Sequence, residues 1–130
     1  MALPRILWVV PLLVAGMYLP TASAAPTRPP AAAVGMAHEA FARKTVVLGC
    51  GQTLTMANNS HWVHIIGPGR NGTLEPAQGV PVVRRELMQT NDVRTTGAWS
   101  TPGTYYLTCS VHPEMNLKVI VTGCKAPASG

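Results

Sequence analysis

Short apolar runs rich in β-branched residues recur along most of the chain, and their spacing is the strongest constraint on its fold. In order they read TVVLGC, QTLTMANN, WVHIIGPG, GVPVVRRELM, TGAWSTPG, GTYYLTC and NLKVIVTGC, with Gly, Pro or Asn in or between them. Helical periodicity is nearly absent, and only residues 82–88 are compatible with one or two helical turns. The pattern predicts an all-β domain, an antiparallel Greek-key β-sandwich of about seven to eight strands.

The N-terminal segment has the pattern of a secretory signal peptide. Arg5 is followed by the apolar residues 6–19 and then by an Ala-Ser-Ala cleavage pattern that ends at Ala24. The apolar run contains Pro11 and is too short to span a bilayer comfortably. We therefore expect residues 1–24 to be removed on export to a periplasm, a lumen or the cell exterior, and we expect no stable membrane insertion.

After this leader we expect one domain with a mildly basic surface. Residues 25–35 are rich in Pro and Ala and predict a flexible arm, which leaves residues 36–130 for the domain. The full chain has ten Lys and Arg and five Asp and Glu, a net charge of +5 at pH 7. Because the basic residues are scattered, they indicate a solvated surface and argue against nucleic-acid binding, while the charge is compatible with an acidic partner.

Three cysteines are an odd number for an exported chain, so one thiol is expected to have a separate role. Cys50 and Cys124 each end a predicted strand and each follow a glycine. Cys109 differs, because a histidine and a methionine lie close to it in the sequence. We predict a disulfide between Cys50 and Cys124 and a free Cys109.

The stretch CSVHPEM, residues 109–115, places a thiol, an imidazole and a thioether three positions apart. Taken singly, Cys109 reads as a buried thiol, His112 as a loop histidine and Met115 as a core residue. Together they form a metal-ligand pattern between two predicted strands, and strand alternation points Cys109 inward. A thioether is a poor zinc ligand, whereas two His and one Cys with a weak axial Met are typical of a blue-copper centre.

Such a centre needs a second histidine from elsewhere in the chain. His61 and His64, in ANNSHWVHIIGPG, are the candidates, because His38 falls in the arm region. His61 and His64 are three positions apart, so in an extended segment they face opposite sides and only one reaches the metal.

The stretch PGTYYLTCSVHPEM, followed by an apolar strand and preceded by an Asn-rich turn before a His, resembles the cupredoxins, small blue copper proteins that include plastocyanin and amicyanin. The resemblance covers residues 44–124. It implies one copper ion bound by His64, Cys109 and His112, with Met115 as a weak axial ligand, and one-electron transfer between Cu(II) and Cu(I).

Two details of this resemblance concern the ligand loops. Two residues separate His112 from Met115, as in amicyanin-like members. Many members also place a polar residue directly after the upstream His, where its side chain ties the two ligand loops together. Here that position is Ile65, so the sequence does not predict a tie through this side chain.

Three functional classes are compared on this basis. We expect an electron carrier, a monomer that meets a redox partner protein, rather than an enzyme, because four histidines do not suffice for a further copper cluster. A protein that stores or delivers copper is the alternative. Trp62 lies near the predicted metal end and is a candidate for partner docking, or else a core or rim aromatic. Asn58 and Asn71 head N-x-Ser/Thr sequons.

Overall fold

The computed structural model describes residues 32–82 and 84–125, and these contain nine strands and no helix. The all-β prediction is therefore confirmed, and no described segment forms a helix able to cross a membrane. The predicted signal peptide lies outside the described residues. The strands are β1 (Ala32–Met36), β2 (Thr45–Gly49), β3 (Leu54–Asn58), β4 (His64–Arg70), β5 (Thr73–Leu74), β6 (Glu86–Met88), β7 (Val93–Thr95), β8 (Gly103–Cys109) and β9 (Asn116–Thr122).

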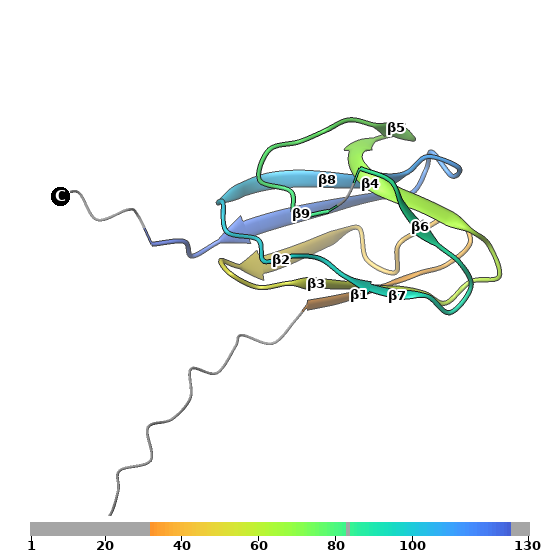
Figure 1. The fold of residues 1–130 in the computed structure, drawn as a ribbon, viewed down its shortest axis with the longest axis horizontal. Helices are drawn as coiled ribbons and strands as arrows, with labels where there is room; N and C mark the ends of the chain where they lie inside the picture. Colours follow the sequence, from red (N-terminus) through yellow and green to blue (C-terminus); the bar gives the residue numbers. More distant parts are fainter. Residues whose placement is uncertain (1–31, 83, 126–130) are drawn as a thin grey trace, which may run out of the picture.

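The strands form two sheets that lie face to face (Figure 1). The smaller sheet has the order β1-β3-β7, and the larger has the order β2-β9-β8-β4-β5, with β6 paired to β4. Both sheets are mixed, because β1 runs parallel to β3 and β2 runs parallel to β9. The expected sandwich is thus correct, but its purely antiparallel character is wrong. Alternation along a strand identifies its buried face and is the same for either direction of pairing.

Two local expectations differ from the structure. The arm was expected to reach residue 35, whereas Ala32–Met36 is β1 and contributes the buried Val34 and Met36. Small residues give this strand little apolar contrast, so it forms because β3 supplies its hydrogen-bond partners. The helical turn expected within residues 82–88 is absent from the described part of that segment, where Glu86–Met88 instead pairs with β4.

The core between the sheets is formed by alternate residues of the strands. Along β9, Leu117, Val119 and Val121 are buried, while the residues between them are half-buried. Trp99 is the largest fully buried side chain, and its indole Nε1 donates a hydrogen bond to Thr96 Oγ1 at 2.9 Å. Trp99 is therefore a core residue.

The predicted disulfide between Cys50 and Cys124 is present, and Cys109 is free and buried. Cys50 follows β2 and Cys124 follows β9. Because β2 and β9 are parallel neighbours, both strands terminate at the same end of the sheet, which brings the two cysteines together. The disulfide thereby links the residues that follow β2 and β9. In sequence order these are the first and last strands of the larger sheet.

Candidate metal centre

The topology brings residues from two distant segments to one end of the sandwich. Strand β8 ends at Cys109, and β4 begins at His64. Because β4 and β8 are antiparallel neighbours with Ile66 opposite Cys109, the start of one lies beside the end of the other. His112 lies in the connection between β8 and β9, which turns over this same end.

Three side chains converge there on one point. The Nδ1 atoms of His64 and His112 are 3.2 Å apart, and each lies 3.7 Å from the Sγ of Cys109. His64 and Cys109 are fully buried, and His112 is half-buried. Among the described residues, these three form the cluster able to hold a metal ion.

The separations fit a single ion bound by all three atoms. Typical metal bonds of about 2.0 Å to nitrogen and about 2.3 Å to sulfur, at a trigonal angle of about 120°, place nitrogen and sulfur about 3.7 Å apart. The same geometry places two nitrogens about 3.5 Å apart. The observed distances of 3.7 Å for both sulfur–nitrogen pairs and 3.2 Å for the nitrogen pair are close to these values, so the three atoms are placed to bind one ion.

A buried polar network sets the orientation of the His64 ring. Its Nε2 lies 3.1 Å from Ser60 Oγ, and that hydroxyl donates to Asn58 Oδ1 at 2.7 Å. Since the hydroxyl proton is directed to Asn58, Ser60 Oγ accepts from the protonated Nε2 of His64. The Nδ1 of His64 then carries a free lone pair that faces Cys109 and His112. Hydrogen bonds of this kind are the usual way in which proteins orient metal-ligating histidines.

The sequence did not reveal Asn58 and Ser60 as part of the site, because they occurred in an ordinary turn and in a sequon. The Asn58 side chain is fully buried, and its Nδ2 donates to the carbonyls of Trp62, Met88 and Gln89. No local pattern distinguishes such an asparagine from a solvated one. Of the two sequon asparagines, only Asn71 is exposed in the folded domain.

Burial also controls the charge state of His64. It lowers the pKa of this imidazole below the usual value of 6.5, and the nearby His112 and then His38 lower the pKa further, against the effect of a backbone hydrogen bond at Ala37. At neutral pH the ring is therefore uncharged. A neutral imidazole is the form that binds a metal ion.

Met115 ends the same loop and is fully buried. Its backbone closes the loop, because Met115 N donates to the His112 carbonyl at 3.0 Å and its own carbonyl accepts from Cys109 N at 3.3 Å and from Thr108 Oγ1 at 2.9 Å. The loop is thus a closed turn anchored at both ends, with the Met115 side chain inside the domain.

The two ligand-bearing segments are tied together by main chain rather than by the side chain at position 65. Ser110 N, directly after Cys109, donates to the carbonyl of Ile65, directly after His64, at 2.9 Å. This bond needs no polar side chain, so an isoleucine at this position is compatible with a fixed separation of the two segments.

The two histidines outside the cluster are His61 and His38, and only His38 lies elsewhere than expected. His61 is exposed in the bend before β4, as expected for a residue in the Asn-Ser turn, although the bend rather than strand alternation separates it from His64. His38, which was expected in the arm region, lies at the site instead. Its ring centroid is 5.3 Å from that of His112, with the two planes nearly perpendicular at 81°.

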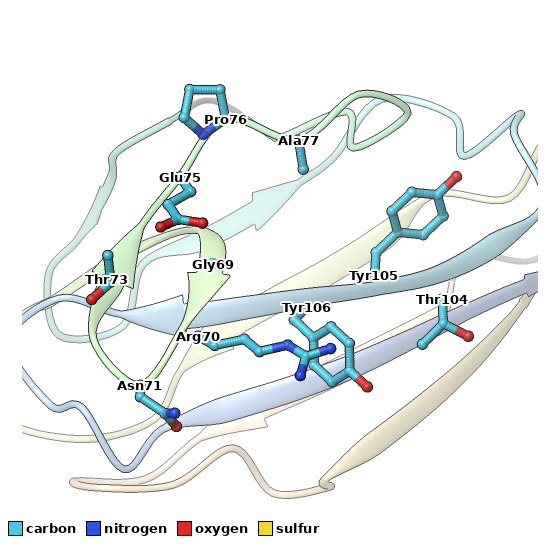
Figure 2. Close-up of a pocket in the computed structure, with 10 residues that line it drawn as sticks. All are labelled: Gly69, Arg70, Asn71, Thr73, Glu75, Pro76, Ala77, Thr104, Tyr105 and Tyr106. Atoms are coloured by element: carbon cyan, nitrogen blue, oxygen red, sulfur yellow. The ribbon is translucent and has the colours of Figure 1, made fainter.

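A surface groove of the described domain lies elsewhere (Figure 2). It has a volume of 460 Å³ and is lined by the hairpin of β4 and β5 and by the first half of β8. There the Arg70 guanidinium lies 3.4 Å from the centroid of the Tyr106 ring. None of the predicted metal ligands lines this groove, so the candidate centre is a cluster at the end of the core rather than a cavity.

Comparison with known proteins places this arrangement in a known fold. No protein-family model matches the chain, and no curated protein matches its sequence. Amicyanin from Paracoccus versutus (Thiobacillus versutus) shares 21% identity, covering 72% of this chain and 83% of its own, with a TM-score of 0.55. A purple cupredoxin from Nitrosopumilus maritimus shares 19% identity, covering 70% of this chain and 99% of its own, with a TM-score of 0.58.

The chain has the cupredoxin fold. A third structure with this fold, a reduced Cu(I) form of an amicyanin variant at pH 4, shares 23% identity, covering 71% of this chain and 82% of its own, with a TM-score of 0.58. The resemblance seen in the sequence is therefore confirmed at the level of the fold. The three clustered side chains lie at the end of this cupredoxin fold where β4 and β8 meet.

Proposed function

We propose that this protein is an exported blue copper protein that carries single electrons between redox partners. The proposed ligands of its one type 1 copper ion are His64, Cys109 and His112, with Met115 as a weak axial ligand. The observation that carries the proposal is the convergence of two imidazole Nδ1 atoms and one buried thiol at separations that fit one ion. The cupredoxin fold supports it, because a structure with this fold is described as a Cu(I) form.

Copper rather than zinc is proposed because of the donor set. Two imidazoles, a thiolate and a weak thioether are typical of blue-copper centres, which alternate between Cu(II) and Cu(I). A bound copper ion would supply this one-electron chemistry. The protein's own part is to hold the neutral His64 ring and the buried Cys109 sulfur in place, and to keep both loops fixed while the charge of the ion changes.

The main-chain hydrogen bonds described above help to keep both loops in place. Ser110 N to the Ile65 carbonyl fixes one ligand segment against the other, and the closed turn from Cys109 to Met115 fixes the spacing within the loop. A site that moves little between oxidation states has a low reorganisation cost on electron transfer. Pro113, directly after His112, further restricts the loop.

An optical spectrum of the full-length chain, or of its processed form, loaded with Cu(II) tests the proposal. We expect an intense visible absorption from charge transfer between the Cys109 thiolate and copper, together with its disappearance on reduction by one electron. A protein that binds copper without colour would instead favour storage or delivery. Failure to bind copper at all would contradict both functions.

The histidine assignment leads to a matched pair of substitutions. We expect His64→Ala to destroy the blue centre, or to open it so that added imidazole restores the colour, because His64 Nδ1 is one of the three converging atoms. His61→Ala should leave the visible spectrum intact, because His61 is exposed outside β4. Spectra of both variants with and without imidazole are the measurement, and the reverse result would contradict the ligand assignment.

The proposed axial ligand gives a further prediction. Met115→Gln replaces a soft thioether by a harder oxygen donor, which stabilises Cu(II) relative to Cu(I). We expect a lower reduction potential with the blue colour retained, measured by redox titration of the absorption. An unchanged potential would show that Met115 only packs in the core.

Export, partner and oligomeric state are part of the same proposal. Residues 1–24 support export by their signal-peptide pattern. The net positive charge supports an acidic redox partner. We propose a monomer in solution, because electron carriers of this size meet their partners transiently.

A further inference from the structure

A stacked histidine–tryptophan pair, His38 and Trp62, lies outside the proposed ligand set and contacts it. The ring of His38 stacks on Trp62, with centroids 4.2 Å apart and planes within 11°. The same His38 ring meets His112 in a nearly perpendicular arrangement at 5.3 Å. His38 therefore lies between an exposed tryptophan and the half-buried His112.

His38 is held by a turn that belongs to the fold rather than to a loose arm. Met36 and Phe41 form an antiparallel bridge around it, and both side chains are buried. Within this turn, Ala37 N donates to the Ala40 carbonyl at 2.8 Å. The backbone on both sides of His38 is thus held by hydrogen bonds, which fixes the position of the His38 Cα from which the ring extends.

Trp62 is held from the other side by the network that orients His64. Its carbonyl accepts from Asn58 Nδ2 at 2.7 Å, and its N–H donates to Ser60 Oγ at 3.2 Å. Asn58 and Ser60 are buried, so Trp62 is attached to the interior of the domain through them. Trp62 as a whole residue is 52% exposed. The ring of the exposed His38 stacks on the Trp62 indole beside the metal end of the domain.

The two proposed histidine ligands differ in how their rings are oriented. His64 has a hydrogen bond on its second nitrogen, Nε2, to Ser60. For His112, the hydrogen-bonding contacts recorded within residues 32–82 and 84–125 involve Nδ1 alone. A metal-ligating histidine usually gains its orientation from a hydrogen bond on the nitrogen that does not face the metal. His112 has instead a ring contact with His38.

We propose that His38 is a positioning residue that, backed by Trp62, orients the His112 ring for metal binding by packing rather than by ligation. The inference rests on the proposed copper centre but concerns how one of its ligands is held. Aromatic ring pairs contribute about 0.5–1.5 kcal/mol beyond the area that they bury, so loss of the contact is expected to weaken binding measurably without abolishing it.

The test uses three variants of the full chain. In His38→Ala the ring contact is lost, and we expect copper or Co(II) to be transferred to a chelator about two- to tenfold faster, with a shift in the thiolate charge-transfer band. In His38→Phe the packing ring is kept without a ring nitrogen, and the rate should stay within about twofold of the original. His61→Ala, an exposed histidine of the neighbouring bend, is the matched control and should leave rate and band unchanged.

Three results would overturn the proposal. Equal rates and band positions in His38→Ala and the unsubstituted protein would leave the ring contact without a role. His38→Phe as fast as His38→Ala would assign the effect to a ring nitrogen. Equal losses in His38→Ala and His61→Ala would show a general effect of removing surface histidines.

A measurement on the metal-free protein separates this proposal from the proposed function. By NMR, His38→Ala should shift and broaden the ring signals of His112 while those of His64, held by Ser60, stay in place. Unchanged His112 signals would contradict the positioning role even if copper binds. If the unsubstituted protein binds neither Cu(II) nor Co(II), the proposed function fails, and the ring signals still decide whether His38 orients His112.

Discussion

Cys109→Ser is expected to remove the visible absorption of the Cu(II) protein completely. The proposed colour arises from overlap of a thiolate sulfur with copper in a trigonal site, and a serine hydroxyl is neither ionised at neutral pH nor soft enough to replace it. Cys109 is the free cysteine of the described domain, so no other thiol there can substitute. The measurement is the spectrum of the variant after addition of Cu(II).

Serine is nearly the same size as cysteine, so the fold should persist even though the residue is fully buried. Far-ultraviolet circular dichroism and the denaturation midpoint of the metal-free variant serve as controls. Met88→Leu, a substitution of a fully buried residue opposite His64 in the neighbouring strand, should keep the colour and so separates packing from ligation. Blue colour in a folded Cys109→Ser variant would contradict the proposed centre.

Removal of the disulfide is expected to have the largest effect on stability. Cys50 and Cys124 are 74 residues apart, and a loop of that length corresponds to about 4 kcal/mol in the chain-entropy model. Domains of this size are stable by only about 5–15 kcal/mol, so the double variant Cys50→Ala, Cys124→Ala should lose a large part of its free energy of unfolding. Urea denaturation of the metal-free protein measures the loss.

The expected loss is separate from the candidate centre, because the two cysteines lie at the ends of β2 and β9, opposite the end that holds His112. Peptide mapping without reduction should recover the linked peptides of Cys50 and Cys124 and an unmodified Cys109. The single variant Cys50→Ala is a useful comparison, since it removes the bridge but leaves the free thiol of Cys124. A change below about 1 kcal/mol in the double variant would contradict a stabilising role for the bridge.

Several features of the fold were predictable because they depend on patterns along the chain. Strand alternation pointed Cys109 inward, and the structure buries Cys109. The positions of Cys50 and Cys124 at the ends of predicted strands led to the correct disulfide. The spacing of Cys109 and His112 within one short loop led to the cluster that the structure contains.

Other features of the fold were not predictable from local patterns. The direction in which β1 meets β3, and β2 meets β9, leaves the alternation of side chains unchanged, so the sequence did not distinguish parallel from antiparallel pairing. β1 also has little apolar contrast of its own. β6 became a strand because β4 supplied a pairing partner for its backbone groups.

The site shows the same division between local and distant information. The sequence by itself determined the β-rich class, the disulfide pair and the loop in which Cys109, His112 and Met115 follow one another, because each of these depends on residue type and spacing. Only the tertiary structure decided that Asn58 and Ser60 orient His64 and that His38 packs against His112. These contacts join segments far apart in the chain, and their geometry exists only after both sheets have assembled.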